Sequence, residues 1–426
     1  MNNAKSSTKS NFGKMGWSMI IYAALSYYIA SALGADLLNY YPAQYAELYG
    51  WNPGVITAMA GLAGWVGVIG AILWAYVVPK MGLKNAAGVF NIITGAMVMV
   101  FANIRSFVGF IILIFAILFI AGSVQVNLIP NNLMAVWFPK KKGIALGWAT
   151  MGMPLCSATI LLICTFLQNL TGSIQTTFTI LGGVIVVFGI VSFFWVKNSP
   201  ESVGCYPDNE VMTPEEFEAS KKEIERHVSG WTLGKLLKNK SVWGIGVGLG
   251  LIWMTTAGVI SQLVPRLMSV AGGIYTPLAI PMVTIASVIG ILGSYFWGWL
   301  DQKIGTKKAC YVYGLWYVVA LILMIMQSIS VVFVWLSVVM VGIAIGGIGN
   351  LIPSLVTSSF GRYDFIEAQK VIAPLNTIVR CAGIILAGIL SQTAWGYTGL
   401  YVVLIVTTII GIIMIRFLVR ENETPR

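Results

Sequence analysis

One arginine, Arg380, stands in the middle of a long apolar stretch near residues 370 to 394. Counted from Lys370, ten residues of helix advance about 15 Å, half of a hydrocarbon core about 30 Å thick. A charge at that depth costs at least about 2.5 kcal/mol, so it is expected to face a cavity or a partner. Because arginine stays protonated and grips a carboxylate through two parallel hydrogen bonds, Arg380 predicts a site for an anionic substrate.

Asp36 is the acid that we weigh against this charge, and it stands near the end of the first apolar segment, residues 17–41. The 19 residues from Trp17 to Asp36 span about 28 Å of helix, which puts Asp36 near the outer face of the membrane. We expect Asp36 to carry a coupling proton or to hold an outer gate. A packing role, or a permanent ion pair with Arg380, is the structural alternative.

Six more side chains are predicted to line the site around Arg380. Aromatic rings would shape an apolar cavity and amides would supply hydrogen bonds; the candidates are Tyr27, Tyr28, Trp253, Tyr295, Asn127 and Asn376. Asn127 belongs to a polar run around Pro130, which should kink its helix because proline removes a backbone donor. Inside a membrane such amides must face protein or water, so they either line a substrate path or join neighbouring helices.

No residue pattern in the sequence predicts catalysis, a metal site or a cofactor. There is no phosphate-binding glycine loop, and the single histidine, His227, lies outside the apolar segments, where it is a poor proton relay. The five cysteines show no metal-ligand or paired spacing and are expected to be small buried hydrophobes. We therefore expect a protein that is not an enzyme and that draws its energy from gradients of ions or solutes.

The elements that position these residues are predicted to be membrane-spanning helices. The chain of 426 residues is 58% hydrophobic and only 10% charged, which lies outside the range of ordinary soluble domains. Twelve apolar segments are long enough to span a bilayer, at residues 17–41, 54–78, 86–104, 107–133, 143–167, 174–196, 242–266, 275–300, 309–328, 330–355, 370–394 and 399–418. The fold class is an all-α integral membrane protein with 12 transmembrane helices.

The net charge of +11 could indicate a nucleic-acid partner, but the positions of the cations indicate topology instead. If both termini are cytoplasmic, 23 of the 26 Lys and Arg residues fall in cytoplasmic segments, and only Arg105 and Arg266 fall in outer ones. This asymmetry follows the positive-inside rule, and the opposite orientation would invert it. We expect a monomer in the lipid bilayer of a plasma or inner membrane, with both termini cytoplasmic and no nucleic acid bound.

Two motifs recur at one offset and predict a duplicated half. Asn-Leu-Ile-Pro occurs at residues 127–130 and again at 350–353, 223 residues later, and residues 75–84 resemble residues 298–307 at the same offset. The expected organisation is therefore two pseudo-symmetric six-helix bundles. The predicted boundaries are an N-terminal tail at 1–16, the first bundle at 17–196, a cytoplasmic loop at 197–241, the second bundle at 242–418 and a tail at 419–426.

The second copy of the loop motif predicts an inner gate. Asp301 stands at the end of its apolar segment and is followed by Gly305, Lys307 and Lys308. A carboxylate at a helix end can interact with neighbouring helix termini and hold one face closed. The first copy has Val78 where Asp301 stands, so such a latch should be asymmetric; a merely charged short loop is the alternative.

The long polar loop between the halves carries two local signals. Thr213, Pro214 and Glu216 form a capping box and predict a short surface helix that runs to about Arg226. Residues 231–238 alternate apolar and basic side chains and predict an amphipathic segment that lies at the membrane interface.

These motifs resemble those of the major facilitator superfamily over essentially the whole chain. Residues 298–308 are similar to its signature loop between the second and third helices of each half. Residues 137–147, which begin Trp-Phe-Pro-Lys-Lys-Lys-Gly, resemble the loop between helices 4 and 5 in the monocarboxylate and oxalate/formate branch. The resemblance implies two six-helix bundles around a central cavity, with alternating access by rocking of one half against the other.

The branch resemblance also bears on the substrate. Members of the oxalate/formate branch are expected to bind dicarboxylate with one basic residue in helix 8 and another in helix 11. Arg380 is similar to the helix 11 cation, about one turn deeper, but helix 8 has Gly293, Ser294 and Tyr295 in the corresponding place and no cation. One fixed charge suits one carboxylate. The helix 1 Lys and helix 8 Asp-Arg pair of the animal monocarboxylate carriers are absent too, so their coupling scheme does not transfer.

The leading hypothesis is a carrier for small monocarboxylate anions such as lactate, pyruvate or formate, driven by proton symport or by anion exchange. A second hypothesis keeps the fold and changes the cargo to a larger amphipathic acid, aromatic or steroid-like. Dicarboxylate/monocarboxylate antiport is a further alternative. A third class, a sensor that binds an anion and signals through residues 197–241 without transport, would be separated from these by flux measurements in proteoliposomes.

Overall fold

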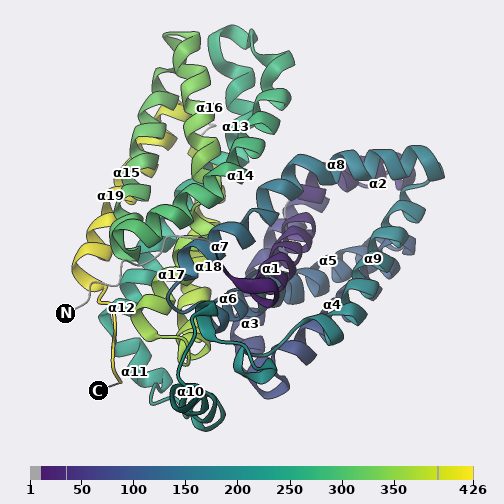
Figure 1. Ribbon diagram of the computed structural model, residues 1–426. Helices are drawn as coiled ribbons and strands as arrows, with labels where there is room; N and C mark the ends of the chain where they lie inside the picture. Colours follow the sequence, from purple (N-terminus) through teal and green to yellow (C-terminus); the bar gives the residue numbers. More distant parts are fainter. Residues whose placement is uncertain (1–10, 35, 391–392, 426) are drawn as a thin grey trace.

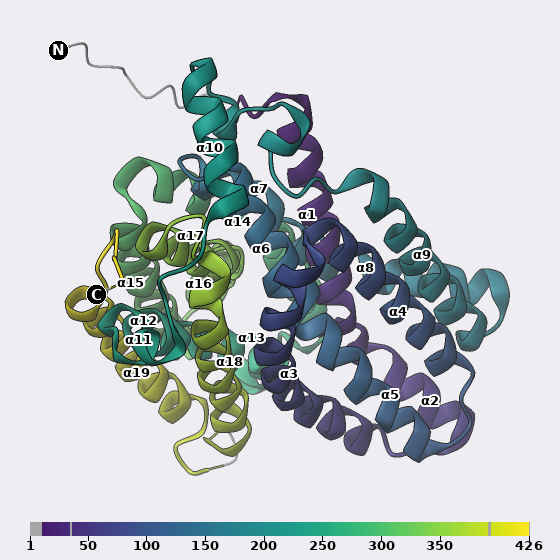
Figure 2. The same cartoon turned by 90° about the horizontal axis from the view of Figure 1, so that it is seen from below.

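The computed structural model describes residues 11–34, 36–390 and 393–425, and across these residues every regular element is a helix. Twelve helical stretches are long and apolar enough to cross a membrane, which confirms the predicted fold class. They form two six-helix bundles (Figure 1), and the view from below in Figure 2 shows the bundles side by side.

The first bundle contains six spans, several of them built from more than one helical element. In chain order they are α1 (Gly13–Gly34); α3 (Pro53–Met81); α4 (Leu83–Asn103); α5 (Phe107–Ile120) with the π-helix η2 (Ala121–Leu128) and α6 (Ile129–Trp137); α7 (Lys142–Thr150) with α8 (Gly152–Thr171); and α9 (Ile174–Trp195). Two short elements, η1 (Asp36–Asn39) and α2 (Tyr41–Tyr49), connect the first span to the second.

The second bundle repeats this order. Its spans are α12 (Lys240–Trp243) with the π-helix η5 (Gly244–Leu249) and α13 (Gly250–Ser269); α14 (Ala279–Ile304), preceded by the short elements η6 (Val270–Gly273) and η7 (Thr276–Leu278); α15 (Thr306–Ile325) with η8 (Met326–Ser328); α16 (Val331–Ile345) with α17 (Ile348–Phe360); α18 (Phe365–Leu390); and α19 (Gly396–Leu418).

The connection between the bundles contains η3 (Glu201–Val203), η4 (Pro207–Asn209), α10 (Pro214–Arg226) and α11 (Leu233–Lys238). The predicted capping box is present at the start of α10. The Thr213 backbone N–H donates to Glu216 Oε2 at 2.9 Å, and the Glu216 N–H donates to Thr213 Oγ1 at 3.3 Å. This reciprocal pair satisfies two amide donors that a helix start otherwise leaves open.

The duplication is visible in backbone geometry. Gly82 (φ 77°, ψ 152°) and Gly305 (φ 89°, ψ 147°) lie 223 residues apart and occupy the same positive-φ conformation in the two signature loops. An L-residue rarely adopts that conformation, which is why both copies use glycine. Trp74 donates its indole N–H to the Phe119 carbonyl at 3.0 Å, and Trp297 repeats the bond to Ile343 at 2.9 Å.

Buried polar side chains join the helices of the first bundle. Tyr22 Oη lies 2.8 Å from Ser192 Oγ, Asn91 donates to Tyr22 at 3.4 Å, and Gln125 donates to Asn91 at 2.7 Å. The chain links α1, α4, α9 and η2 through their interior faces. Hydrogen bonds of this kind hold helices together where lipid removes the hydrophobic drive for association.

Two details differ from the sequence-based expectations. Helix α1 begins at Gly13 and ends at Gly34, whereas the first apolar segment was expected over residues 17–41; Pro42 and the polar residues beside it instead belong to the separate helix α2. Pro130 lies in the first turn of α6, directly after the π-helix η2. A missing N–H costs little at that position, so the π-helix, rather than a proline kink within one α-helix, marks the break.

The bundles meet at one end only. We call the end that carries the inter-bundle connection the base, and the opposite end the far end. Helix α14 packs on α7 and α8 of the first bundle, and α18 packs on α3. From these contacts the bundles diverge toward the far end (Figure 1).

Candidate functional site

Arg380 is partly buried in α18 and is the sixteenth of the helix's 26 residues, in the middle third of the span. Its Cζ lies 4.8 Å from the centre of the Trp253 ring in α13, a cation–π contact. The Nε atom is buried and has no hydrogen-bond partner, and none of the ion pairs among the described residues includes Arg380. The guanidinium is therefore covered on one face and open for hydrogen bonds along its edge.

Asn376 lies one helical turn before Arg380 and is 1% exposed. Neither its amide nitrogen nor its amide oxygen has a hydrogen-bond partner. The side chain points toward the start of α13, because a Cβ on Gly250 would lie 3.4 Å from Asn376 Oδ1. A buried amide without partners is costly, and this one provides a donor and an acceptor next to the unpaired edge of Arg380.

Helix α13 is preceded by an irregular segment that packs against α18. The π-helix η5 runs from Gly244 to Leu249 and contacts α18 and α19. A Cβ on Gly246 would meet the Leu375 side chain at 2.8 Å, so this approach of two helices depends on glycine. Such π-helical segments are frequent at functional sites. They give this end of α13 the freedom to shift relative to Arg380.

The structure separates two neighbouring tyrosines that were both predicted to line the site. Tyr27 is 1% exposed and donates its hydroxyl to Asn131, so it belongs to the core of the first bundle in this conformation. Tyr28 is partly buried, and its hydroxyl lies 2.9 Å from Thr159 Oγ1 in α8. Adjacent residues on a helix point about 100° apart, which is why the two rings have different surroundings.

Asp36 lies in η1, just beyond α1, and accepts a hydrogen bond from Ser31 Oγ at 2.7 Å. Ser157 and Cys156 of α8 also lie within hydrogen-bonding reach of this carboxylate. Ser157 is the residue 223 positions before Arg380. The two therefore occupy equivalent depths in the two bundles, and Asp36 contacts the first-bundle counterpart of the Arg380 position.

Tyr295 and Asn127 lie away from Arg380. The Tyr295 ring is 5.1 Å from the Trp148 ring of α7, and Trp148 in turn contacts Trp17 at 5.4 Å, so Tyr295 packs across the contact between the bundles. Asn127 lies in η2 and donates to the Gly122 carbonyl of the same segment at 3.4 Å. Of the predicted site residues, the structure brings together Arg380, Trp253 and Asn376.

Asp301 is buried against the opposite bundle. It accepts a hydrogen bond from Ser354, and a Cβ on Gly143 in the first turn of α7 would lie 2.6 Å from Asp301 Oδ2. The carboxylate therefore lies beside the N-terminal end of a helix from the other bundle, where a negative charge is favoured. Gln302 extends the contact, since its amide donates to the Lys140 carbonyl at 3.0 Å.

With two bundles, a repeated loop at equal offset and an acid pressed against the other half, the chain can be compared with known proteins. The Major Facilitator Superfamily sequence profile matches residues 14–368. The chain belongs to the major facilitator superfamily. It is therefore a multi-pass membrane transporter. No curated protein sequence matches it significantly.

Solved transporters of the superfamily share this fold. The proton:xylose symporter XylE bound to 6-bromo-6-deoxy-D-glucose superposes with a TM-score of 0.75 at 13% identity, covering 95% of this chain and 96% of that one. The human organic anion transporter MFSD10 (TETRAN) superposes with a TM-score of 0.69 at 12% identity, covering 94% and 98%. At such identities the likeness establishes the fold and leaves the substrate class open.

The transporter's bundle contact depends on glycine. A Cβ on Gly298 would lie 2.3 Å from the Gly143 carbonyl oxygen, so Gly298→Ala is expected to force α14 away from α7. Overpacking of this kind costs about 1–3 kcal/mol, here in the base-closed state. We expect transport to slow by at least about fivefold, measured as initial uptake. Gly64→Ala, whose Cβ would have nothing within 4 Å, is the control and should transport normally; equal rates for both variants would contradict the prediction.

The other residues of the predicted gate loop have different surroundings. Gly305 ends α14 and has no neighbour that a Cβ would meet. Lys307 donates its ammonium to the carbonyls of Arg416 at 3.1 Å and Val419 at 2.7 Å, both at the end of α19 in its own bundle. Lys308 is exposed. The structure thus places Asp301 at the contact between bundles and Lys307 at a helix terminus.

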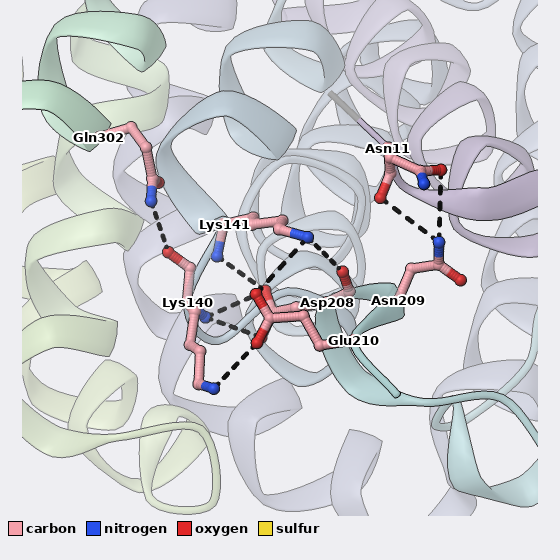
Figure 3. A network of polar contacts seen from close by, with 7 residues as sticks. All are labelled: Asn11, Lys140, Lys141, Asp208, Asn209, Glu210 and Gln302. Atoms are coloured by element: carbon pink, nitrogen blue, oxygen red, sulfur yellow. Dashed lines mark hydrogen bonds and ion pairs between the residues drawn. The ribbon is translucent and has the colours of Figure 1, made fainter. Parts of the chain in front are cut away.

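The inter-bundle connection contributes a polar network at the base (Figure 3). Asp208 accepts the backbone N–H of Lys140 at 3.0 Å and that of Lys141 at 2.7 Å, and Lys140 Nζ lies 2.9 Å from Glu210 Oε2. Burial raises the pKa of Asp208, and the two backbone N–H groups oppose that rise. The hydrogen bond and charge of Lys140 lower the pKa of Glu210. The network ties the loop before α7 to the connection.

Two ion pairs at the base were not anticipated from the sequence. Arg362 Nη2 lies 2.7 Å from Glu201 Oε1, with side chains only 10% and 1% exposed, and it joins the second bundle to the segment that follows α9. His227 Nε2 lies 2.8 Å from Asp364 Oδ1, at the start of α18. Glu201 and Arg362 are 161 positions apart; no spacing rule connects them, so only the tertiary structure reveals the pair.

Proposed function

We propose that this transporter carries small organic monocarboxylate anions, of the size of lactate, pyruvate or formate, by alternating access. The observation that carries the proposal is the guanidinium of Arg380, which lies in the middle third of a span, rests on Trp253 and has no acidic partner among the described residues. A charge kept at that depth without a counter-ion is a functional-site candidate. A carboxylate would supply the missing charge and bind as a fork.

One fixed cation favours one carboxylate over two. Gly293 and Ser294 of α14 are buried against α16 and α17, and Tyr295 packs on Trp148, so this part of helix 8 offers no second charge. The amide of Asn376 could then bind a hydroxyl or oxo group next to the carboxylate, since both its polar atoms lack partners. Tyr28 and Asn127 are the first-bundle candidates for completing the site when the bundles close.

Asp36 is the proposed proton-coupling residue. It contacts Ser157, which occupies the depth of Arg380 in the other bundle, and its carboxylate is held by hydroxyl donors. XylE is described as a proton:xylose symporter, which makes proton coupling a precedent within this fold. Anion exchange remains the alternative coupling mode.

We further propose that the base faces the cytoplasm. By the alternation of the spans, both termini, the inter-bundle connection and 23 of the 26 Lys and Arg residues fall at the base. The positive-inside rule then puts the base in the cytoplasm and the diverging end of the bundles outside, in a plasma or inner membrane. We keep the expectation of a monomer.

A larger amphipathic carboxylate is the second candidate. The Trp253 ring over Arg380 offers an apolar surface beside the charge, and the human protein MFSD10 is described as an organic anion transporter. Dicarboxylate/monocarboxylate antiport ranks lower because it needs a second cation.

The test is a ligand screen on the purified protein. We expect short monocarboxylates to raise its melting temperature, because a ligand that binds only the folded state stabilises it by mass action. Dicarboxylates and bulky acids of equal charge form the comparison arms, and counterflow in proteoliposomes then checks transport of any stabilising acid. Stabilisation by neutral sugars alone would overturn the proposal, and stabilisation by bulky acids alone would replace it with the second candidate.

A further inference from the structure

Four cations gather at the base where α15 begins and α19 ends. Lys307 and Lys308 stand in the first turn of α15, and Arg416 and Arg420 stand at the end of α19. The Lys307 ammonium lies on the carbonyls of Arg416 and Val419, which brings the two helix ends into contact. We call Lys307, Lys308, Tyr311, Arg416 and Arg420 the α15–α19 patch.

The patch is positively charged and accessible. Lys308, Arg416 and Arg420 are exposed, and none of its cations is in an ion pair among the described residues. The hydroxyl of Tyr311 is buried and faces Arg416. Glu421 is the one acid whose charge acts on Lys307, against two neighbouring arginines. Concentrated like charge of this kind favours an anionic ligand.

Exposed apolar side chains continue directly from the patch toward the far end. Val312 and Leu315 on α15 are 38% and 56% exposed, and Ile413 and Phe417 on α19 are 50% and 76% exposed. In Figure 2, α15 and α19 lie at the edge of the second bundle, away from the first. This surface faces acyl chains, while the patch lies at the level where headgroups begin.

The internal repeat shows that the fold does not require this charge. At the offset of 223, Lys84 and Lys197 correspond to Lys307 and Arg420, but Asn85 and Phe193 stand where the second half has Lys308 and Arg416. Gly88 likewise replaces Tyr311, and a Cβ on Gly88 would touch the Phe193 ring at 2.4 Å. The same packing position is thus apolar in one half and polar and cationic in the other.

We propose that the α15–α19 patch binds the phosphate-bearing headgroup of an anionic phospholipid, with the acyl chains lying along the exposed side chains of α15 and α19. Lys308, Arg416 and Arg420 contact the phosphate, and Tyr311 orients Arg416. Free phosphate has the same charge chemistry, but it does not use the adjoining apolar surface, so the site is assigned to a lipid.

The test is native mass spectrometry of the detergent-purified protein titrated with phosphatidylglycerol, phosphatidylcholine or inorganic phosphate. The site variant Lys308→Asn/Arg416→Phe installs the residues of the first half, so it removes two charges with side chains that the fold already accepts. Each charge contributes about fivefold to affinity, so we expect about 25-fold weaker binding of phosphatidylglycerol. The control Lys84→Gln/Lys197→Gln also removes two charges and should bind phosphatidylglycerol normally.

Arg416→Gln/Arg420→Gln is a second site variant that introduces no apolar side chain, and a melting temperature for each protein shows that it is folded. Equal loss of binding in the site and control variants would overturn the proposal, because it would reduce the effect to net charge. Equal affinity for phosphatidylcholine, or displacement of the lipid by millimolar phosphate, would overturn it as well.

Discussion

Arg380→Gln is expected to abolish uptake of the carboxylate chosen by the ligand screen while leaving the protein folded. Truncating one partner of a desolvated charge pair costs about 2–5 kcal/mol, so substrate binding should weaken by at least about 30-fold. Stability should be kept or improved, because the guanidinium has no acidic partner whose charge would be left unpaired. The measurement is initial uptake in proteoliposomes together with the ligand-induced shift in melting temperature.

Two further variants separate charge from geometry. Arg380→Lys keeps the positive charge but loses the planar fork, so we expect weak binding that is intermediate between the native protein and Arg380→Gln. Arg105→Gln removes one exposed arginine outside the site and should transport at the native rate. Uptake by Arg380→Gln with an unchanged KM would remove Arg380 from the binding site.

Breaking the ion pair between Glu201 and Arg362 is expected to shift the transporter away from its base-closed state. With side chains only 10% and 1% exposed, Arg362→Gln leaves the Glu201 carboxylate buried without its cation. Removing one partner of a buried pair costs about 3–5 kcal/mol, which changes a two-state equilibrium by more than about 100-fold. Spin labels at Asn85 and Lys308, at the bases of the two bundles, should report longer distances in a background without the native cysteines.

The chain offers a rescue and a control for this experiment. The exchanged pair Glu201→Arg/Arg362→Glu should restore much of the short-distance population, because the charges again meet. Lys140→Gln/Glu210→Gln removes a pair whose side chains are 75% and 44% exposed, and pairs this exposed contribute at most about 1 kcal/mol. An unchanged distance distribution in Arg362→Gln would show that other contacts hold the base closed.

Span number, duplication and the exceptional position of Arg380 follow from local and additive properties of the sequence. Hydropathy over about 20 residues decides whether a segment enters the bilayer, and it needs no knowledge of neighbours. The offset of 223 similarly predicted that Gly82 and Gly305 would share one backbone conformation, which the structure confirms. The capping box at Thr213 is a local signal of the same kind, and it too is confirmed.

The rotation of each helix about its axis was decided only by the tertiary structure. Tyr27 and Tyr28 read alike in sequence, but one donates to buried Asn131 and the other meets Thr159. In a soluble protein an apolar stripe would have oriented the helix. A membrane helix is apolar on its lipid face as well as on its protein face, so polar contacts and glycine approaches fix its rotation.

Long-range pairing was likewise beyond sequence reasoning. Among the second-half gate residues, Asp301 lies against Gly143 of the other bundle, whereas Lys307 turns to the end of α19 in its own. Both are charged residues near one helix end, and their separate partners depend on which helices the bundles bring together. The sequence by itself determined twelve spans in two halves with one arginine at depth. The packing of those halves decided which charges meet, because contacts between distant segments exist only once both bundles are assembled.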